Sequence, residues 1–216
     1  MMRDGSVLVL LGPPGAGKGT QGERLASDLG IPKIATGDVL RAAAGAGTPL
    51  GLEAKAYMDR GDLVPDEVIL GIMRETLAAP DARKGAILDG VVRTVPQAEG
   101  LEKILRDLKR DLAAVLFFEL NDAEAIRRAA GRTVCADCQT PYTGLAAGTR
   151  CPKCGGTLVR RRDDEPEAVR NRLREYQAKT APVVAWYVEH RYPVLRIDAV
   201  GPVDEVAARV RHALGI

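Results

Sequence analysis

The sequence predicts an α/β protein with a parallel sheet flanked by helices and one small insertion. Three observations carry this prediction. Short apolar runs alternate with longer segments of helical period along most of the chain, and a glycine-rich loop follows the first apolar run. Strands separated by helices in this way form parallel sheets through right-handed crossovers. Residues 131–164 interrupt the alternation, because they are rich in Gly, Thr, Pro and Cys and show no helical period.

The elements of the first half follow from periodicity and from helix-end signals. Residues 6–11 are expected to form a buried strand, and the next segment a helix that ends at Gly30. A short strand around Ile34 should precede a helix that starts near Asp38. Further elements are expected at residues 49–61 (helix), 66–79 (helix capped by Asp66), 85–90 (strand) and 96 to about 109 (helix).

The second half continues the alternation on both sides of the insertion. Residues 112–120 are the most hydrophobic strand candidate, and a helix from 122 to about 130 follows. Pro166 fits the first turn of a long helix over residues 166–191, in which Pro182 should cause a kink or an interruption. A last strand at 193–198 and a last helix at 202–215 complete the sheet and its cover.

The composition indicates a soluble globular protein. Of the 216 residues, 46% are apolar and 28% are charged. The formal net charge of +2 argues against a broad nucleic-acid surface, although basic residues concentrate between Arg150 and Arg174. No apolar run reaches membrane-spanning length, and the first residues lack a signal-peptide cleavage site. We therefore expect a cytoplasmic protein, in which clustered cysteines hold a metal more often than they form disulfides.

Residues 12–20 have the composition of a phosphate-binding loop. The stretch reads GPPGAGKGT and fits the pattern G-x-x-x-x-G-K-[ST] only with a shift, because the hydroxyl comes one position late, at Thr20. Glycines let backbone N–H groups close around a phosphate, and the following helix adds its dipole. Lys18 can reach the outer phosphates of a nucleotide. The alternative is an ordinary glycine-rich turn, and the loop alone predicts only a nucleotide phosphate.

All four cysteines lie in the insertion, in a C-x₂-C…C-x₂-C arrangement. Four thiolates at this spacing suit tetrahedral Zn²⁺ with no ligand position left open, so the site would be structural. Unpaired thiols, disulfides and an iron–sulfur cluster are the alternatives. Zinc binding would also stabilise a segment that is too short to build a core. The predicted ligands are Cys135, Cys138, Cys151 and Cys154.

Five motifs in a fixed order resemble one known family. They are GPPGAGKGTQ (12–21), TGDVLRAA (36–43), LVPDE (63–67), DGVVRTVPQA (89–98) and RRDDEPEAVRNRL (161–173). Together they resemble the adenylate kinase family in its long form, whose lid carries a zinc knuckle. The resemblance runs from residue 7 to the C-terminus and implies a P-loop nucleoside monophosphate kinase fold. It divides the chain into a P-loop core (1–34, 65–130 and 165–216), an AMP-binding segment (35–64) and a zinc-binding lid (131–164).

The resemblance implies that the protein transfers the terminal phosphoryl group of Mg-ATP to AMP, giving two ADP, and that it acts as a monomer. An acceptor phosphate is already anionic, so the chemistry needs cations and alignment rather than a general base. Asp89 ends a buried strand, where α/β sheets place ligands, and in the family the matching carboxylate helps to hold Mg²⁺. The implied catalytic residues are Lys18, Asp89, Arg93, Arg132, Arg161 and Arg172.

The resemblance also assigns the two nucleotide sites. The residues implied for ATP binding are Gly15, Ala16, Gly17, Lys18, Gly19, Thr20, Arg128, Arg132, Pro141, Tyr142 and Gly201. Those implied for AMP are Thr36, Arg41, Asp62, Leu63, Val64, Gly90, Arg93, Gln97, Arg161 and Arg172. Asp163 and Asp164 should pair with the arginines. Thr36 has a second interpretation as a helix N-cap, and any single arginine has one as a solvated surface charge.

The chain departs from the family pattern at residues 91 and 92. The family usually reads Asp-Gly-Phe-Pro-Arg-Thr where this chain has Val91 and Val92 before Arg93. The peptide bond before that proline is characteristically cis, and a cis bond costs far more before valine. Either the cis bond persists or the loop takes another route. We expect a less well positioned Arg93 and weaker AMP binding or turnover.

Two rival functions remain open from the sequence. A P-loop ATPase or GTPase could use a zinc ribbon to bind nucleic acid, but the insertion offers only Tyr142 for stacking and the net charge is near neutral. AMP-dependent ADP formation that nucleic acid does not affect would exclude it. A nucleoside monophosphate kinase for another acceptor base is the second rival, which a panel of acceptors would resolve.

Overall fold

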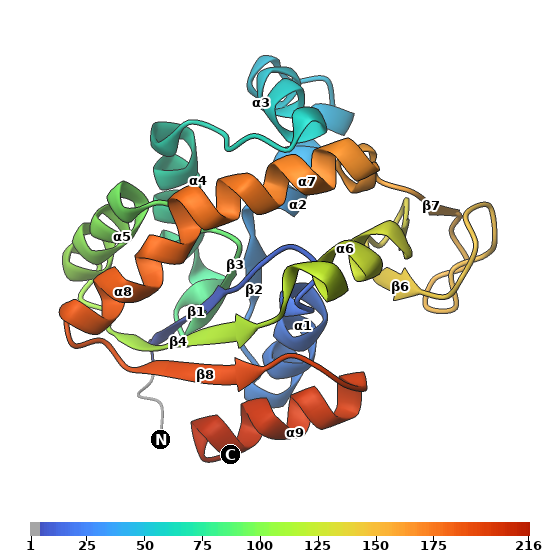
Figure 1. Cartoon of the computed structure of the whole chain (residues 1–216). Coiled ribbons are helices and arrows are strands. Elements are labelled where there is room, and N and C mark those ends of the chain that lie inside the picture. The colour runs from blue at the N-terminus through green and yellow to red at the C-terminus, as the bar shows by residue number, and fades with distance from the viewer. Residues whose placement is uncertain (1–4) are drawn as a thin grey trace.

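The computed structural model describes residues 5–216, so the first four residues of the predicted core lie outside the described part. A five-stranded parallel sheet of order β2-β3-β1-β4-β8 forms the centre of the molecule (Figure 1). Its strands are β1 (Val7–Leu11), β2 (Lys33–Ala35), β3 (Ala86–Asp89), β4 (Leu112–Glu119) and β8 (Val194–Asp198). The predicted fold class, a parallel α/β sheet flanked by helices, is confirmed.

Helices cover both faces of this sheet because its strands are apolar on both sides. Alternate residues of β1 enter two separate cores, with Val7 and Val9 in one and Leu8 and Leu10 in the other. The first core is closed by α4 (Asp66–Ala78), α5 (Val95–Asp107) and α8 (Ala181–Glu189). The second is closed by α1 (Lys18–Leu29) and α9 (Val203–Leu214), and Figure 1 shows the two groups on opposite sides.

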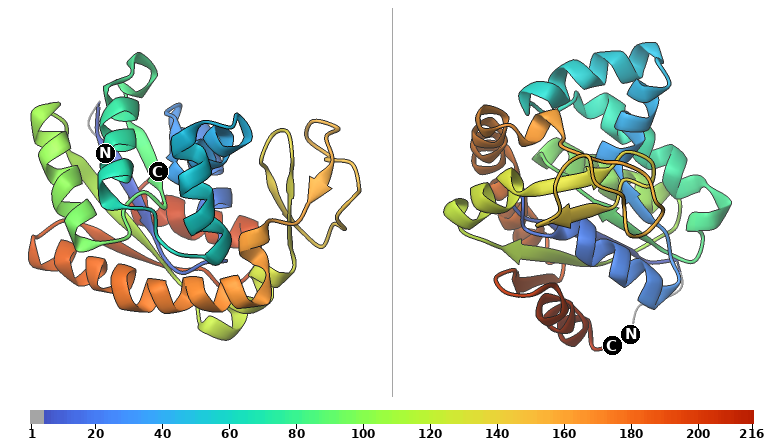
Figure 2. Two further views of the ribbon diagram at one scale, coloured as in Figure 1. Left: turned by 90° about the horizontal axis from the view of Figure 1, so that it is seen from above. Right: turned by 90° about the vertical axis from the view of Figure 1, so that its right-hand side faces the viewer.

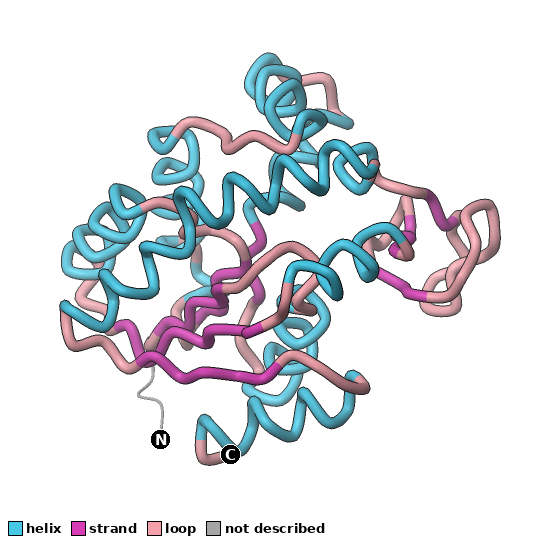
Figure 3. Tube along the Cα trace, viewed as in Figure 1, coloured by secondary structure: helices cyan, strands magenta, loops and turns pink. Residues whose placement is uncertain are grey.

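The strand order places a ligand crevice beside β1. The chain adds β2 and β3 on one side of β1 and then β4 and β8 on the other. In open parallel sheets, ligands bind outside the carboxyl ends of the strands where the order reverses in this way. The five strands, which lie side by side in magenta in Figure 3, are parallel, so their carboxyl ends lie at the same edge as the loops that follow β1 and β3.

Two excursions leave the sheet near this crevice. The first, which we call the acceptor segment (residues 35–64), carries α2 (Thr36–Gly45) and α3 (Pro49–Arg60). The second, which we call the cysteine segment (residues 131–164), follows α6 (Asp122–Ala130) and projects from the body in the left view of Figure 2. It forms an antiparallel sheet of order β6-β5-β7, from β5 (Arg132–Cys135), β6 (Pro141–Thr143) and β7 (Leu158–Val159).

The long helix predicted over residues 166–191 is interrupted, as Pro182 indicated. It consists of α7 (Pro166–Glu175), a π-helical turn η3 (Tyr176–Thr180) and α8. The N–H of Ala181 donates to the carbonyl of Tyr176, which is the wider spacing of a π turn. Proline has no N–H and its ring clashes with the carbonyl four residues earlier, so a regular α-helix cannot continue through this point.

The acceptor segment is tied to α7. The Asn171 side-chain Nδ2 donates to the carbonyl of Arg60 at 2.9 Å and to Asp62 Oδ1 at 2.7 Å. Arg60 and Asn171 both donate to the Asp62 carboxylate and hold its pKa below the usual range. A Cβ on Gly61 would lie 2.7 Å from the carbonyl of Ala168, so α3 ends in backbone contact with α7.

The predicted N-cap of α4 is wrong. Pro65 holds the N-cap position without a side-chain bond, and Asp66 is the first helical residue. The Asp66 carboxylate instead accepts from Thr94 Oγ1 at 3.1 Å and from Gln97 Nε2 at 2.7 Å. The Asp66 carboxylate is therefore bound by Thr94, the N-cap of α5, and by Gln97 in its first turn, and does not cap α4. The other predicted helices and sheet strands follow the expected order, and the 3₁₀ turns η1 (Pro80–Ala82) and η2 (Arg162–Asp164), which were not predicted, are added to them.

No helix in the described part of the chain, residues 5–216, has the length and apolar character needed to cross a membrane.

Candidate active site

The loop between β1 and α1 has the backbone of a phosphate cradle. Gly12, Gly15 and Gly17 have φ values of 145°, 80° and 86°. A Cβ on Gly12 would lie 2.6 Å from the carbonyl oxygen of Phe118, and one on Gly15 would lie 2.7 Å from that of Ala125. The loop is therefore packed against the backbone of β4 and α6 at positions that only glycine fits. It ends at the N-terminus of α1, where free N–H groups and the helix dipole attract an anion.

Lys18 lies folded against this loop. Its Nζ donates to the carbonyl of Gly12 at 2.7 Å and to that of Pro13 at 2.9 Å. Burial lowers the pKa of Lys18 to about 7, Asp89 opposes this effect, and Arg93 adds to it. The side chain is therefore a cation that the free protein solvates poorly and that an anion would stabilise.

This lowered pKa predicts that polyphosphate binding takes up a proton. Above about pH 7 the free protein holds Lys18 partly neutral, and a bound triphosphate favours the ammonium and raises its pKa again. Titration calorimetry with a non-hydrolysable Mg-ATP analogue, in buffers of different ionisation enthalpy, should show uptake approaching one proton near pH 8. Near pH 6 the uptake should vanish, because Lys18 is already protonated.

The matched control is the Lys18→Met variant, which should bind more weakly and take up no proton at either pH. Equal uptake by the variant and by the parent chain would show that another group titrates.

One cavity of about 450 Å³ collects the predicted nucleotide-binding residues. It is lined by Gly15, Ala16, Gly17, Lys18, Gly19, Thr20, Thr36, Arg41, Asp62, Leu63, Val64, Asp89, Gly90, Arg93, Gln97, Arg128, Arg132, Pro141, Arg161, Arg172 and Gly201. Among the predicted nucleotide-binding residues only Tyr142 is missing from this lining. Its hydroxyl lies 3.2 Å from Cys151 Sγ, so its side chain belongs to the cysteine cluster.

Arginines and carboxylates from the cysteine segment and from α7 meet at one wall of this cavity. Arg132 donates to both oxygens of Asp164, through Nε at 2.8 Å and through Nη2. Arg172 Nη1 donates to Asp163 Oδ2 at 2.9 Å and to Asp164 Oδ1 at 3.2 Å.

These ion pairs shift the pKa values of their members. Burial alone would lower the pKa of Arg132, but the Asp164 carboxylate raises it. Burial would raise the pKa of Asp163, but Arg172 and Arg132 hold it below its usual range. The predicted pairing of Asp163 and Asp164 with arginines is thus present.

In the described part of the chain, Arg93 carries a buried charge without an ion-pair partner, and Arg161 has only a distant one, Asp38 at 3.7 Å. Burial, together with Arg172 for Arg93 and Arg41 for Arg161, lowers the pKa of each to about 10. Within residues 5–216, no carboxylate lies within ion-pair distance of Arg93. The Nε atoms of Arg41 and Arg161 are buried without a hydrogen-bond partner. Buried cations in this state favour binding of a multiply charged anion.

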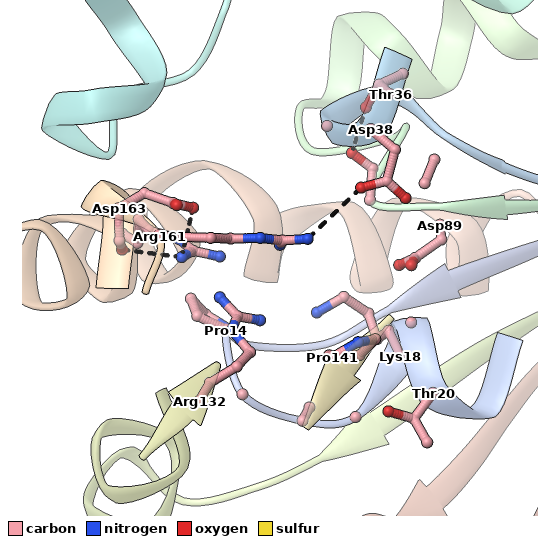
Figure 4. A pocket seen from close by; sticks show the side chains of 18 of the residues that line it. Pro14, Lys18, Thr20, Thr36, Asp38, Asp89, Arg132, Pro141, Arg161 and Asp163 are labelled. Atoms are coloured by element: carbon pink, nitrogen blue, oxygen red, sulfur yellow. Dashed lines mark hydrogen bonds and ion pairs between the residues drawn. The ribbon is translucent and has the colours of Figure 1, made fainter. Parts of the chain in front are cut away.

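Asp38 is a cavity residue that the sequence interpretation missed. Its carboxylate lies 2.5 Å from Arg41 Nη2 and 3.7 Å from Arg161 Nη2, as Figure 4 shows for Arg161. It joins the acceptor segment to residue 161, at the end of the cysteine segment. The available signal was the i, i+3 spacing of Asp38 and Arg41 in a predicted helix.

The oxygen atoms near the phosphate loop suit a hard cation. Asp89 ends β3, Thr20 lies in the first turn of α1, and both line the cavity (Figure 4). Mg²⁺ prefers one or two such oxygens together with water and substrate phosphates. The residues present therefore fit a magnesium ion that arrives with a nucleotide.

The side of the cavity formed by α2 and α5 is held by three hydrogen bonds. Thr36 Oγ1 donates to the carbonyl of Gly90 at 3.2 Å, and Gln97 Oε1 accepts from the N–H of Arg93 at 2.7 Å. Thr36 is the first residue of α2 and Ala35 is its N-cap, so the N-cap interpretation of Thr36 does not hold. Because Nε2 of Gln97 makes one bond, to Asp66, the amide keeps one hydrogen and one lone pair for a ligand.

The peptide bond between Val91 and Val92 is trans, so the loop does not keep the cis bond typical of the family. No peptide bond is cis within residues 5–216, and Val91 and Val92 are each 1% exposed in the core. Arg93 nevertheless lines the cavity.

Restoring the family's residues should strengthen the acceptor site. In the double variant Val91→Phe/Val92→Pro, we expect a severalfold lower Michaelis constant for AMP or a severalfold higher turnover, because proline restricts the backbone before Arg93. Steady-state kinetics of ADP formation measures both. Val91→Phe alone is the control, since it adds the ring without changing the backbone. If neither constant changes in the double variant, the valines do not limit Arg93.

The four cysteines form a cluster of metal-binding geometry. Their Sγ atoms all lie within 4.8 Å of one another, with Cys135 and Cys154 at 3.4 Å and Cys138 and Cys151 at 3.7 Å. A tetrahedral Zn²⁺ with Zn–S bonds of about 2.3 Å would hold sulfurs about 3.8 Å apart. All four thiols are free of disulfides. The set therefore fits a closed tetrahedral ion.

Comparison with known proteins agrees with this geometry. The family model for adenylate kinase matches residues 10–192. An adenylate kinase of Gemmatimonas aurantiaca is 62% identical over 97% of this chain and 99% of its own length. Adenylate kinases of Salinispora tropica and Syntrophotalea carbinolica are 49% and 48% identical, each over 96% of this chain and over 97% and 98% of their own lengths. The chain therefore belongs to the adenylate kinase family.

Proposed function

We propose that the protein reversibly transfers the terminal phosphoryl group of Mg-ATP to AMP, giving two ADP. One observation carries the assignment of residues to this reaction. Lys18 and five arginines (Arg41, Arg93, Arg132, Arg161 and Arg172) converge on one cavity at the carboxyl edge of the sheet. A single bound phosphate would not need so many cations, whereas two nucleotides that meet through their phosphates would.

The proposed mechanism consists of alignment and charge compensation. The N–H groups of residues 15–20 and Lys18 hold the phosphates of ATP, and Arg41 and Arg93 hold the phosphate of AMP. Arg132, Arg161 and Arg172 lie between them and compensate the charge on the transferred group. Mg²⁺ held near Asp89 and Thr20 would supply further neutralisation of the ATP phosphates. The AMP phosphate oxygen is already anionic, so no side chain has to remove a proton.

The choice of AMP is supported by two acceptor-side groups. Thr36 fixes the Gly90 carbonyl, and Gln97 keeps one donor and one acceptor for a base edge. A buried amide that retains one donor and one acceptor rejects a base that cannot satisfy them. The residues Asp62, Leu63 and Val64 complete this side of the cavity.

Two segments are proposed to move. The acceptor segment would close over AMP and the cysteine segment over ATP, which excludes water from the phosphates. Ion pairs between the end of the cysteine segment and the acceptor segment support this, namely Arg161 with Asp38 and Arg162 with Asp59, each at 3.7 Å. The zinc ion would stiffen the cysteine segment, and the neighbouring arginines would compensate the negative charge of the phosphates.

The partners and location complete the proposal. We propose a cytoplasmic monomer that binds ATP, AMP and ADP and neither nucleic acid nor membrane, on the basis of its near-neutral charge and its family. Light scattering during size-exclusion chromatography tests the monomer, and a second, larger species at micromolar concentration would contradict it.

A coupled assay of ADP formation tests the function itself. AMP, GMP, CMP and UMP are offered as acceptors with Mg-ATP, with and without added DNA or RNA, and the metal content is measured on the same sample. We expect activity with AMP, little with the other acceptors, no effect of nucleic acid and one zinc per chain. Faster turnover with another monophosphate, or ATP hydrolysis that needs no acceptor, would reject the proposal.

A further inference from the structure

The peptide backbone of Arg93 is held at both of its polar groups. Its N–H donates to Gln97 Oε1 at 2.7 Å, and its carbonyl accepts from Thr180 Oγ1 at 2.9 Å. The side chain makes one further bond, from Nε to the carbonyl of Gly90 at 2.8 Å. These three bonds do not use the terminal nitrogens of the guanidinium, and Arg93 lines the cavity.

Thr180 reaches Arg93 from a distant part of the chain. It is the last residue of the π-helical turn η3, and 87 residues separate the two partners. A threonine within a helix commonly bonds the carbonyl three or four residues earlier in the same helix. The hydroxyl of Thr180 instead crosses to the Arg93 loop, and the residue is only 6% exposed. Thr180 ends the π turn that precedes Pro182, where the regular α-helical hydrogen bonds are interrupted.

The bond lies behind the nucleotide cavity rather than in it. Thr180 is absent from the lining of the 450 Å³ cavity, but it lines a smaller cavity of about 50 Å³ next to it. Lys18, Arg93 and Arg172 contribute to the wall of the smaller cavity as well. Thr180 can therefore act on the acceptor site only through the residue that it holds.

We infer that Thr180 is a positioning residue for the acceptor phosphate: its hydroxyl fixes the Arg93 peptide and thereby aims the Arg93 guanidinium. The inference rests on the proposed function of Arg93. The other two bonds of Arg93 are made with Gln97 and Gly90, which themselves line the acceptor side. The bond from Thr180 is thus one anchor that can be removed without touching any residue proposed to contact a nucleotide.

The position matters more in this chain because its loop carries valines before Arg93. Proline at residue 92 would fix the φ angle at this point through its ring, whereas Val92 lacks that covalent restraint. Small displacements of a group that binds a reacting phosphate are costly, since alignment supplies much of the rate. The Thr180 hydroxyl supplies a restraint from outside the loop.

The experiment compares Thr180→Val with Thr180→Ser in the full chain. Valine has the shape of threonine without the hydroxyl, whereas serine keeps the hydroxyl and loses the methyl. We expect Thr180→Val to lower kcat/KM for AMP by about tenfold, the value of one well-formed hydrogen bond. The Michaelis constant for ATP should stay within about twofold, and Thr180→Ser should stay close to the parent chain.

Thr76→Val is the matched control. The Thr76 hydroxyl donates to the carbonyl of Ile72 at 2.6 Å within its own helix, so this variant loses the same kind of bond elsewhere. It should leave both Michaelis constants unchanged. If Thr180→Val melts below the assay temperature, the pair Thr180→Ala and Thr180→Ser, assayed in the cold, gives the same contrast between a missing and a retained hydroxyl.

Three results would overturn the inference. They are an unchanged kcat/KM for AMP in Thr180→Val, Michaelis constants for AMP and ATP that rise equally in that variant, or a kcat/KM for AMP that falls as much in Thr180→Ser as in Thr180→Val. The first removes the role of the bond, and the others assign Thr180 to packing. Failure of the proposed function is distinguishable, because the parent chain itself would then form no ADP from AMP.

Discussion

Replacing Lys18 with methionine should lower ADP formation by about 10²- to 10³-fold while the protein stays folded, since removal of one preorganised donor to a transition-state charge has effects of this size. The Lys18 ammonium is held in the phosphate loop by the Gly12 and Pro13 carbonyls. Methionine matches its length and has no charge, so the variant retains the packing of the stem and loses the compensation of the phosphates.

Stability should respond in the opposite direction. The pKa of Lys18 is lowered to about 7 by burial, which means that the folded state disfavours the ammonium that the unfolded chain accepts freely. This unfavourable contribution is fully present below pH 7 and disappears as the pH rises towards 10.5. Lys18→Met should therefore melt at the same temperature as the parent chain or higher, and the gain should be larger near pH 6 than near pH 9.

The coupled assay and thermal melts at the two pH values measure both effects. Lys103→Met is a suitable control, because Lys103 is exposed on α5 and has no role at the cavity. Turnover within tenfold of the parent chain would show that Lys18 does not compensate the transferred charge. A marked drop in melting temperature would show that its hydrogen bonds outweigh the cost of its burial.

Replacing the four cysteines should strongly lower the thermal stability of the protein. The cysteine segment has a small apolar core, in which Leu158 is buried together with Cys135 and Cys151. Structural zinc contributes on the order of 10 kcal/mol to folding in isolated small domains, and only part of this is needed to hold so short a segment. Replacing the ligands with serine should lower the melting temperature by about 10 °C or more, at a scale of 2–4 °C per kcal/mol.

The chemistry should change much less than the stability. At a temperature well below the melt, the serine variants should keep turnover within a few-fold of the parent chain, because the arginines at 132, 161 and 172 carry the charge. A chelator should reproduce the loss of stability in the parent chain and have no effect on the variants. A large loss of turnover in a variant that remains fully folded would make the metal part of the reaction.

Much of the fold could be predicted because its signals are local. Strand β1 and most of β4 are continuous apolar runs, Gly30 ends α1 in the left-handed conformation, and the cysteine spacing is that of a metal site. The glycines of the phosphate loop are equally local signals, although the close carbonyls of Phe118 and Ala125 that require them are not.

The parts that could not be predicted depend on contacts between distant segments. Asp66 was expected to cap its own helix, but α5 brings Thr94 and Gln97 to its carboxylate. The Tyr142 side chain follows the sulfur cluster instead of the cavity, and Thr180 meets Arg93 across 87 residues. A sequence pattern describes neighbours along the chain and cannot identify such partners, because they become close only when the sheet brings the loops together.

The link between Asn171 and the end of α3 has a thermodynamic consequence. Helix α7 holds the acceptor segment through Asn171, and it also carries Arg172, which bonds both carboxylates at the end of the cysteine segment. One helix is therefore hydrogen-bonded to both segments. If the two segments close over AMP and ATP as proposed, binding at one site changes the affinity at the other, and linkage requires the two factors to be the same.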